Sequence, residues 1–368
     1  MKKKLLIFMD TMKPMKDGVS MFLENTLPLL VKNYEVTIIA PKYSDEMYEN
    51  AKLITFPMYK LIGVAYGAPK VNRKKIKEEV KKCDVIISHE SVSPFASSFY
   101  GLFYARKFNK PFFTYIHSVD FELFTEVFKL PNIIKIFEKT FLQIYARWFL
   151  SRETATIVSF PTIEKMLKKI KVKGKFETVP IGITDIFYPG VSKFDFNNKI
   201  VLGYVGRISR EKGIDFLLEI FLKLKNKYEN IQLVIVGGGP MIDYFKNKKD
   251  VKVTGFVSHE ETADYYRAFD IFVLPSLTEA NSLSTLEALK SGVCCVNSDV
   301  GAIHDYIKNG YNGFFYYSKD EFISILEKLI QNEKLRKDIG RNASESVKHL
   351  TWENTVNNLI NVFEKYKK

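Results

Sequence analysis

The feature that most constrains the fold is a regular alternation of short apolar runs and amphipathic stretches along all 368 residues. Continuous apolar runs separated by helical patterns predict parallel strands with helices covering both faces of the sheet. The predicted strands are residues 5–9, 36–40, 85–88, 112–116, 155–158, 200–205, 233–236, 271–274 and 293–296. Helical patterns lie between them, for example at residues 19–32, 214–227 and 283–290.

The length predicts two domains, because a single hydrophobic core rarely grows beyond about 250–300 residues. The strands fall into two series, each large enough for a Rossmann-like domain. Pro189, Gly190 and polar neighbours interrupt the pattern between them. We therefore expect an α/β fold with two doubly wound parallel-sheet domains, residues 1–185 and 186–368, facing a cleft. Ligands of such sheets bind beyond the carboxyl ends of the strands.

Composition narrows the classes of function. No apolar run reaches the ~18 residues of a membrane span, and the first run stops at Asp10, too early for an export signal. The three cysteines show no metal or redox spacing, which favours a cytoplasmic location. The net charge of +13 lies mostly in the first 185 residues. It indicates an anionic partner or a lysine-rich composition without a role. Nucleic acid is not expected, because the second half is nearly neutral and lacks a nucleic-acid-reading motif.

Two loops after predicted strands of the second domain carry charged residues suited to ligand binding. Arg207 and Lys212 follow the strand at 200–205 and precede a helix, a setting that suits a diphosphate. Alone, such a turn is more often a charged surface loop. Glu279 and Glu287 follow the strand at 271–274, and their carboxylates could accept hydrogen bonds from vicinal hydroxyls. Alone, Ser284 and Glu287 also fit a helix capping box, which favours a structural role for Glu287.

Three further features are weaker evidence for a ligand-binding or catalytic site. The glycines at 237–239 predict a tight turn after a strand rather than a cofactor motif, because the third glycine of a dinucleotide fingerprint is missing. Gly18, after the first strand, would let helix-start amides approach an anion, although most loop glycines are only conformational. His117 follows the strand at 112–116, and we weigh catalytic and structural roles evenly for it.

Missing motifs exclude several mechanisms. The sequence has no P-loop, no Asp-x-Asp pair that could clamp a divalent metal, and no Gly-x-Ser-x-Gly elbow of an esterase. We therefore expect no cofactor and no metal in the site. Leaving-group charge would be met by Arg207, Lys212 and amide dipoles.

With these motifs in order, the sequence resembles glycosyltransferase family 4 (group 1 type), a retaining family with the GT-B fold. The resemblance spans essentially the whole chain and is strongest over residues 200–313. The matching motifs are Gly-Arg207-x4-Lys212-Gly, Glu279-x7-Glu287, the segments at 179–187, 237–240 and 254–257, and Asn309-Gly310-x-x-Gly313. Their ordered combination is specific. The family fold implies that the C-terminal helix returns to the first domain.

The resemblance implies a hexosyltransferase with a nucleoside-diphosphate sugar as donor, bound by the second domain, and an acceptor bound by the first. It implies that Arg207 and Lys212 hold the diphosphate, Glu279 the hexose and Glu287 the ribose. It places the base at the backbone near Phe256, amides at Gly18 on the phosphates, and His117 near the reacting centre. Residues 280–282 replace the family's usual aromatic and glycine, which could alter donor fit. The resemblance also implies donor contacts from Asn281, Ser282 and Leu283 in that loop.

The acceptor is the least constrained partner. The basic first half suggests a membrane lipid or lipid-linked acceptor, with attachment to the inner face of the cell membrane. The helix at 130–150 could lie on an anionic membrane, but the spacing of Ile134, Phe137, Phe141, Tyr145 and Trp148 favours packing in the core. The alternatives are a soluble acceptor or a non-catalytic sugar-nucleotide-binding protein.

Overall fold

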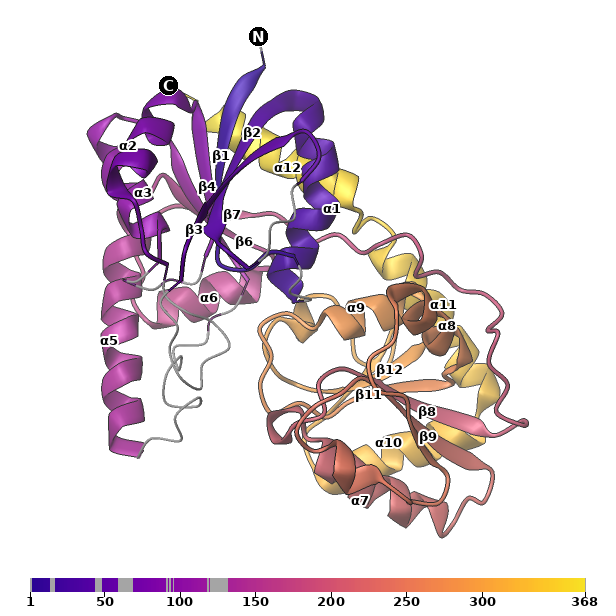
Figure 1. Ribbon diagram of the computed structural model, residues 1–368. Coiled ribbons are helices and arrows are strands. Elements are labelled where there is room, and N and C mark those ends of the chain that lie inside the picture. The colour runs from indigo at the N-terminus through magenta and orange to yellow at the C-terminus, as the bar shows by residue number, and fades with distance from the viewer. Residues whose placement is uncertain are drawn as a thin grey trace. The chain divides into compact units, whose positions relative to one another are not determined.

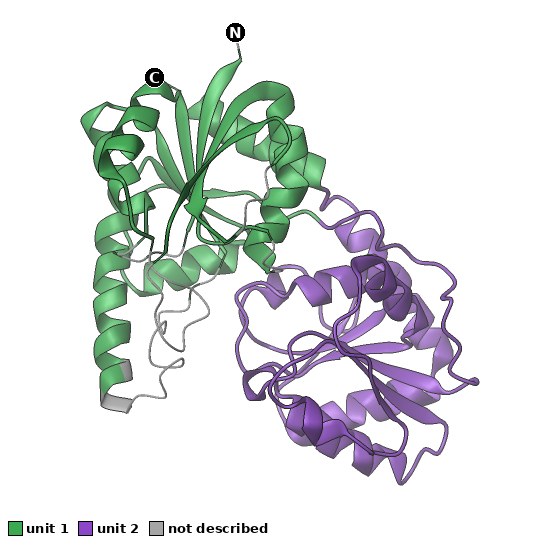
Figure 2. Cartoon of the chain, in the orientation of Figure 1, with its two compact units in different colours: residues 1–182, 352–368 green, residues 183–351 purple. Residues whose placement is uncertain are grey.

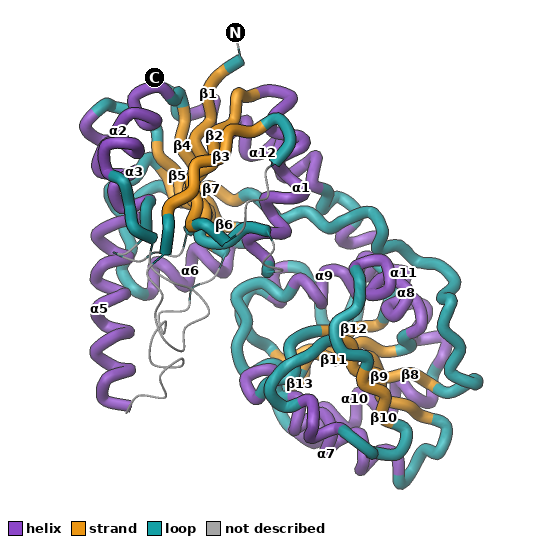
Figure 3. Tube along the Cα trace, viewed as in Figure 1, coloured by secondary structure: helices purple, strands orange, loops and turns teal. Residues whose placement is uncertain are grey.

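The structure is a computed structural model that describes residues 2–13, 17–43, 48–58, 69–90, 92, 94, 96–117, 119 and 132–367. The chain divides into two compact units, Met1–Gly182 with Trp352–Lys368, and Ile183–Thr351 (Figure 2). Each unit contains one parallel sheet with helices packed on it (Figures 1 and 3). The α/β class with two parallel-sheet domains is therefore confirmed.

The first unit is built on a seven-stranded sheet of order β3-β2-β1-β4-β5-β6-β7. The strands are β1 Lys3–Met9, β2 Tyr34–Pro41, β3 Ala51–Phe56, β4 Val85–His89, β5 Phe112–Ile116, β6 Ala155–Val158 and β7 Phe176–Thr178. The helices are α1 Gly18–Asn33, α2 Arg73–Lys82, α3 Ser98–Lys107, α5 Asn132–Leu150, α6 Pro161–Lys169 and α12 Trp352–Lys365. The central strands β1, β4 and β5 are apolar and almost fully buried, which is why they form the middle of the sheet.

The C-terminal helix α12 belongs to the first unit, as the resemblance implied. Its Phe363 ring packs against Phe113 of β5, with ring centroids 5.3 Å apart. Thr355 Oγ1 donates a hydrogen bond of 2.8 Å to the carbonyl of Pro180. At the end of the helix, Lys365 Nζ lies 2.6 Å from the Glu177 carboxylate. Apolar packing and polar contacts together hold this distant segment on the first sheet.

The second unit has a six-stranded parallel sheet of order β10-β9-β8-β11-β12-β13. The strands are β8 Ile200–Val205, β9 Ile231–Val236, β10 Val251–Val253, β11 Ile271–Leu274, β12 Cys294–Ser298 and β13 Phe314–Tyr316. The helices are α7 Ile214–Lys225, α8 His259–Ala268, α9 Leu283–Lys290, α10 Lys319–Gln331 and α11 Glu333–Val347. Short 3₁₀ turns, η1 Arg210–Lys212 and η2 Ile242–Phe245, follow β8 and β9. In both sheets the order turns back at the first strand, so the loops after β1, β4, β8 and β11 flank the switch points where ligands bind.

The expectation that the helix at 130–150 packs in the core is wrong for most of its length. Phe137 and Phe141 are 71% and 56% exposed, and Ile136 and Ile144 are also exposed. Only the C-terminal half of α5 packs on the sheet, where Tyr145 is buried. The apolar residues do share one face of the helix, but no described residue covers that face over most of its length. None of the described helices combines the length and the apolar character that a bilayer span requires.

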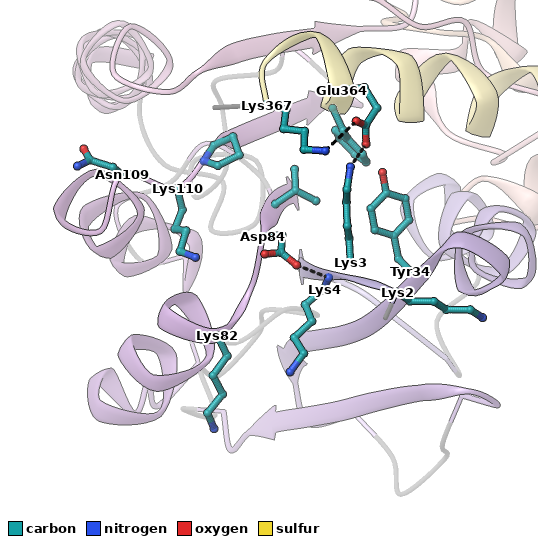
Figure 4. A pocket seen from close by; sticks show the side chains of 13 residues that line it. Lys2, Lys3, Lys4, Tyr34, Lys82, Asp84, Asn109, Lys110, Glu364 and Lys367 are labelled. Atoms are coloured by element: carbon teal, nitrogen blue, oxygen red, sulfur yellow. Dashed lines mark hydrogen bonds and ion pairs between the residues drawn. The ribbon is translucent and has the colours of Figure 1, made fainter.

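A group of lysines lies at the amino ends of the strands of the first unit. A pocket of about 500 Å³ opens there, and Figure 4 shows its lining side chains. The lysines in this lining are Lys2, Lys3, Lys4, Lys82, Lys110 and Lys367. Lys3 forms an ion pair with Glu364, and Lys2 Nζ donates to the carbonyl of Val31 near the end of α1. These lysines lie at the opposite end of the strands from the loops in which sites of such folds form.

Candidate functional site

Lys212 and Glu279 meet in the second unit, at the carboxyl ends of β8 and β11. Lys212 Nζ lies 2.7 Å from Glu279 Oε1. Ser276 Oγ donates a second hydrogen bond of 2.7 Å to the same carboxylate oxygen. The Glu279 side chain is 9% exposed and that of Lys212 is 26% exposed, so the pair is sheltered but reachable. The ammonium and the carboxylate are therefore held in fixed positions before any ligand arrives.

Close backbone contacts hold the two loops of this pair together. Gly213 adopts φ +64°, and a Cβ atom at this position would lie 2.0 Å from the Pro275 carbonyl oxygen. The Leu277 amide donates to the Glu211 carbonyl at 2.9 Å. On the other side, a Cβ at Gly301 would lie 2.0 Å from the Glu279 carbonyl oxygen. Glycine is required at both positions because no side chain fits and the backbone is left-handed.

Arg207 and Phe256 flank the glycine turn after β9. The Arg207 side chain is exposed, and among the described residues its guanidinium has no partner. Its carbonyl accepts a 2.8 Å hydrogen bond from Tyr204 Oη. Phe256 is 86% exposed, and its ring lies over Gly238, where a Cβ would be 2.6 Å from the ring. Residues 237–239 therefore form the tight turn that was expected. The exposed Arg207 guanidinium and the exposed Phe256 ring lie on either side of it.

Glu287 lies in α9 and does not belong to a capping box, so that interpretation is wrong. The N-cap of α9 is Ser282, whose Oγ accepts from the Thr285 amide at 3.2 Å. Instead, Glu287 Oε2 lies 3.1 Å from Tyr266 Oη, which also lies 2.9 Å from the Ser284 carbonyl. Burial raises the pKa of Glu287 to about 8, while the Tyr266 hydrogen bond lowers it. The carboxyl group is therefore largely protonated at neutral pH without a ligand.

The remaining donor-loop residues are Asn281, Ser282 and Leu283. Ser282 is buried, and its hydroxyl is used locally by Thr285. Thr285 Oγ1 in turn donates to Asn297 Oδ1 at 3.0 Å. Leu283 is the first residue of α9, and Asn281 precedes its N-cap. Ser282 therefore shapes the loop, while a donor contact of all three residues stays a prediction.

His117, in the first unit, forms a pair with a second histidine. His89 ends β4 and His117 directly follows β5, and His89 Nδ1 lies 2.9 Å from His117 Nε2. Burial lowers the pKa of His117 to about 3. Burial, and then the nearby His117, lower the pKa of His89 well below its usual value. Both rings are therefore neutral at physiological pH.

Gly18 begins α1, but the carboxylate of the preceding residue occupies the helix start. Asp17 Oδ1 accepts hydrogen bonds from the amides of Val19 and Ser20 at 3.1 Å and 2.9 Å. Thr11 Oγ1 donates to the same oxygen at 2.9 Å. A phosphate at these amides would have to displace Asp17, so phosphate binding at Gly18 stays a prediction. Residues 14–16, which precede this helix start in the sequence, and Ser118 and Asp120, which follow His117, lie outside the described residues.

The sequence analysis missed three residues at these sites. Tyr266 carries no motif, and its contact with Glu287 depends on how α8 and α9 pack. Glu90 follows His89 and is buried, and burial and the charge of Asp10 raise its pKa to about 8. His89 had a usable signal, because it directly follows the predicted strand at 85–88, just as His117 follows the predicted strand at 112–116, and the two strands are neighbours.

Comparisons with known proteins show which family the chain resembles. The family model "Glycosyltransferase Family 4" matches residues 16–185, and the model "Glycosyl transferases group 1" matches residues 192–346. The alpha-monoglucosyldiacylglycerol synthase of Acholeplasma laidlawii is 26% identical, covering 93% of this chain and 92% of that protein.

Solved structures show the same fold. Sucrose-phosphate synthase from Thermosynechococcus elongatus matches with a TM-score of 0.77 at 18% identity, covering 99% of each chain. Anabaena HepE in complex with UDP-glucose matches with a TM-score of 0.72 at 14% identity, covering 98% of this chain and 99% of that chain. The two family models together span nearly the whole chain, and the fold is that of GT-B enzymes. The protein therefore belongs to the family 4 glycosyltransferases of the group 1 type, and it is an enzyme of that class.

Proposed function

We propose that this glycosyltransferase moves a hexose from a nucleoside-diphosphate sugar to a lipid or lipid-linked acceptor, with retention of configuration and without a metal ion. The observation that carries the donor side is the Lys212–Glu279 pair at the carboxyl ends of β8 and β11. The Lys212 ammonium can bind phosphate oxygens, and the adjacent Glu279 carboxylate can accept hydrogen bonds from sugar hydroxyls. The UDP-glucose bound to HepE, a protein of the same fold, supports this class of donor.

The proposed chemistry assigns a role to each charged group. Arg207, exposed and without a described partner, can bind phosphate oxygens as a fork, and Lys212 acts as a compact charge. Together they would stabilise the negative charge that develops on the leaving diphosphate, so that no metal is required. Glu279 would accept hydrogen bonds from the hexose, and Glu287 from the ribose. No protein nucleophile is assigned, because the leaving diphosphate can help remove the acceptor proton on the same face of the sugar.

The acceptor proposal is supported by one relative and by one helix. The Acholeplasma laidlawii relative is named for a lipid product, and it is similar over nearly the whole chain. In the first unit, α5 exposes Phe137, Phe141 and Trp148. The Arg152 guanidinium lies 4.7 Å from the centre of the Trp148 ring. Exposed aromatics beside basic groups suit the interface of an anionic membrane.

A transfer assay with defined donors and vesicles tests the function. The full-length protein is incubated with UDP-, GDP- or ADP-glucose and phosphatidylglycerol vesicles that contain diacylglycerol or monoglucosyldiacylglycerol. We expect one donor to raise Tm and to yield an α-linked glycolipid at an unchanged rate in excess EDTA. A β-linked product would overturn retention, and a loss of rate with EDTA would overturn metal independence. Transfer to neither lipid, with transfer to a free sugar added in a parallel reaction, would overturn the lipid assignment.

Tyr266→Phe is expected to raise KM for the donor by about 3- to 10-fold with little change in kcat. The variant removes one hydrogen bond to Glu287, and such a bond contributes about 0.5–1.5 kcal/mol. Steady-state kinetics with varied donor measures the effect. Tyr265→Phe is the matched control on α8, because the Tyr265 ring stacks on Phe194 at 4.1 Å and does not touch Glu287. An equal KM in wild type and Tyr266→Phe would show that Glu287 does not contribute to donor binding through this contact.

Replacing Phe137 and Phe141 together by serine is expected to weaken binding to phosphatidylglycerol vesicles by about 10-fold or more. Each phenyl ring contributes roughly 1 kcal/mol or more when it leaves water for the interface. Co-sedimentation with vesicles measures the loss. Leu222→Ser, on α7 of the second unit, replaces another exposed apolar side chain, 41% exposed, and should bind like wild type. Unchanged sedimentation of the double variant would remove α5 from membrane binding.

A further inference from the structure

The histidine pair of the first unit is packed among aromatic rings. β4 and β5 are parallel neighbours, with Ser88 opposite Thr114, so alternation along the strands puts His89, Tyr115 and His117 on one face. The Phe22 ring of α1 contacts all three rings, at centroid distances of 4.9 Å to His89, 4.7 Å to Tyr115 and 5.1 Å to His117. His89 is 4% exposed, whereas His117 is partly exposed. The inner ring is thus fixed by packing, and the outer ring faces the carboxyl edge of the sheet.

The hydrogen bond between the rings fixes which nitrogen of His117 is available. Two neutral imidazoles 2.9 Å apart must share one proton, so one nitrogen donates and the other accepts. Whichever ring donates, His117 Nε2 is used by His89. The nitrogen left for a ligand is then His117 Nδ1, which has no partner among the residues that the structure describes.

We propose that His89 is a positioning residue for sugar transfer, which holds His117 Nε2 so that His117 Nδ1 is presented to a substrate at the carboxyl edge of the first sheet. The inference rests on the proposed function, because it takes a substrate of the transfer reaction to bind beside His117. Burial keeps both rings neutral, so the pair does not place two positive charges side by side. A ring fixed by a neighbour loses less freedom when it meets the transition state than a freely rotating one.

A matched pair of amide variants tests the role. In His89→Asn, the amide lies near the former position of Nδ1 and can still bond His117. In His89→Gln, the longer side chain carries its amide toward the position of Nε2 and loses that geometry. We expect His89→Gln to lower kcat by roughly 10- to 100-fold with KM for the donor within threefold, and His89→Asn to stay within about fivefold of wild type. Equal rates for both variants and wild type would overturn the proposal.

A spectroscopic measurement separates positioning from stability. The chain has five histidines, so the ring nitrogens can be assigned in ¹⁵N-labelled protein. We expect His117 to show one neutral tautomer in wild type and in His89→Asn, and a mixture in His89→Gln. Tyr115→Phe, which removes the hydrogen bond of that ring to the Val179 carbonyl, should lower Tm without changing the His117 tautomer. Unchanged His117 nitrogen shifts in His89→Gln would also overturn the proposal.

The transfer rates and the nitrogen shifts together distinguish a failure of the proposed function from a failure of the positioning role of His89. If wild type transfers no sugar to any acceptor, the proposed function fails, while the nitrogen shifts still decide whether His89 fixes the His117 ring. If wild type is active and His89→Gln keeps full kcat, the positioning role fails and the function stands. If either variant does not fold, the single tautomer in wild type, with Nε2 hydrogen-bonded, remains the decisive observation. A wild-type mixture of tautomers contradicts the inference.

Discussion

Lys212→Ala is expected to lower kcat/KM for sugar transfer by about 100- to 1000-fold while the protein stays folded. The diphosphate gains negative charge as the sugar departs, and a preorganised cation removed from such a position costs about this much in rate. Lys212 Nζ is held 2.7 Å from Glu279 Oε1 before any ligand binds, so its position costs no reorganisation during the reaction. Initial rates with the donor identified by the assay measure the effect.

Folding should be affected little by the same substitution. Glu279 loses its ion pair but keeps the hydrogen bond from Ser276 Oγ, and a partly exposed pair contributes about 1 kcal/mol. We expect Tm to fall by only about 2–4 °C. Lys223→Ala, on the exposed side of α7, is the matched control and should keep wild-type activity. Transfer by Lys212→Ala within threefold of wild type would remove Lys212 from the donor site.

The sequence predicts the centre of each sheet well and its edges poorly. Every predicted strand is found, whereas β3, β7, β10 and β13 were not predicted. These four are the outermost strands of the two sheets. β7 and β10 are three-residue strands without a buried residue, and β10 has an exposed central lysine. β13 is largely buried, but it is also only three residues long, too short to stand out as an apolar run. An apolar run in a sequence reveals a strand only when the strand is buried and several residues long, so short or exposed edge strands are missed.

The candidate site was predicted where a side chain follows a strand, and missed where it depends on packing between elements. Lys212 and Glu279 come directly after neighbouring strands, so topology alone brings their loops together. Tyr266 reaches Glu287 from another helix, and no spacing in the sequence encodes that contact. For α5 the apolar spacing was correct but its direction was not. A pattern specifies which residues share a face, and the neighbouring elements decide whether that face is covered.

Gly213→Ala is expected to destabilise the second unit by about 3 kcal/mol and to reduce transfer strongly. A left-handed backbone costs a residue with a side chain about 1 kcal/mol. The larger part comes from the contact, because the new Cβ would lie 2.0 Å from the Pro275 carbonyl oxygen, which belongs to the backbone and cannot rotate away. The loop that carries Glu279 must then move away from Lys212. We expect Tm to fall by roughly 6–12 °C, measured by calorimetry.

Gly255→Ala separates the contact from the backbone conformation. Gly255 has a similar φ of +73°, but a Cβ there would meet no atom within 4 Å. It should therefore cost only about 1 kcal/mol, or roughly 2–4 °C in Tm. If the two alanine variants lost equal stability, the contact between Gly213 and Pro275 would not be what holds the loops together. A larger loss for Gly213→Ala, with lower activity, would show that this close approach joins the cation to the carboxylate.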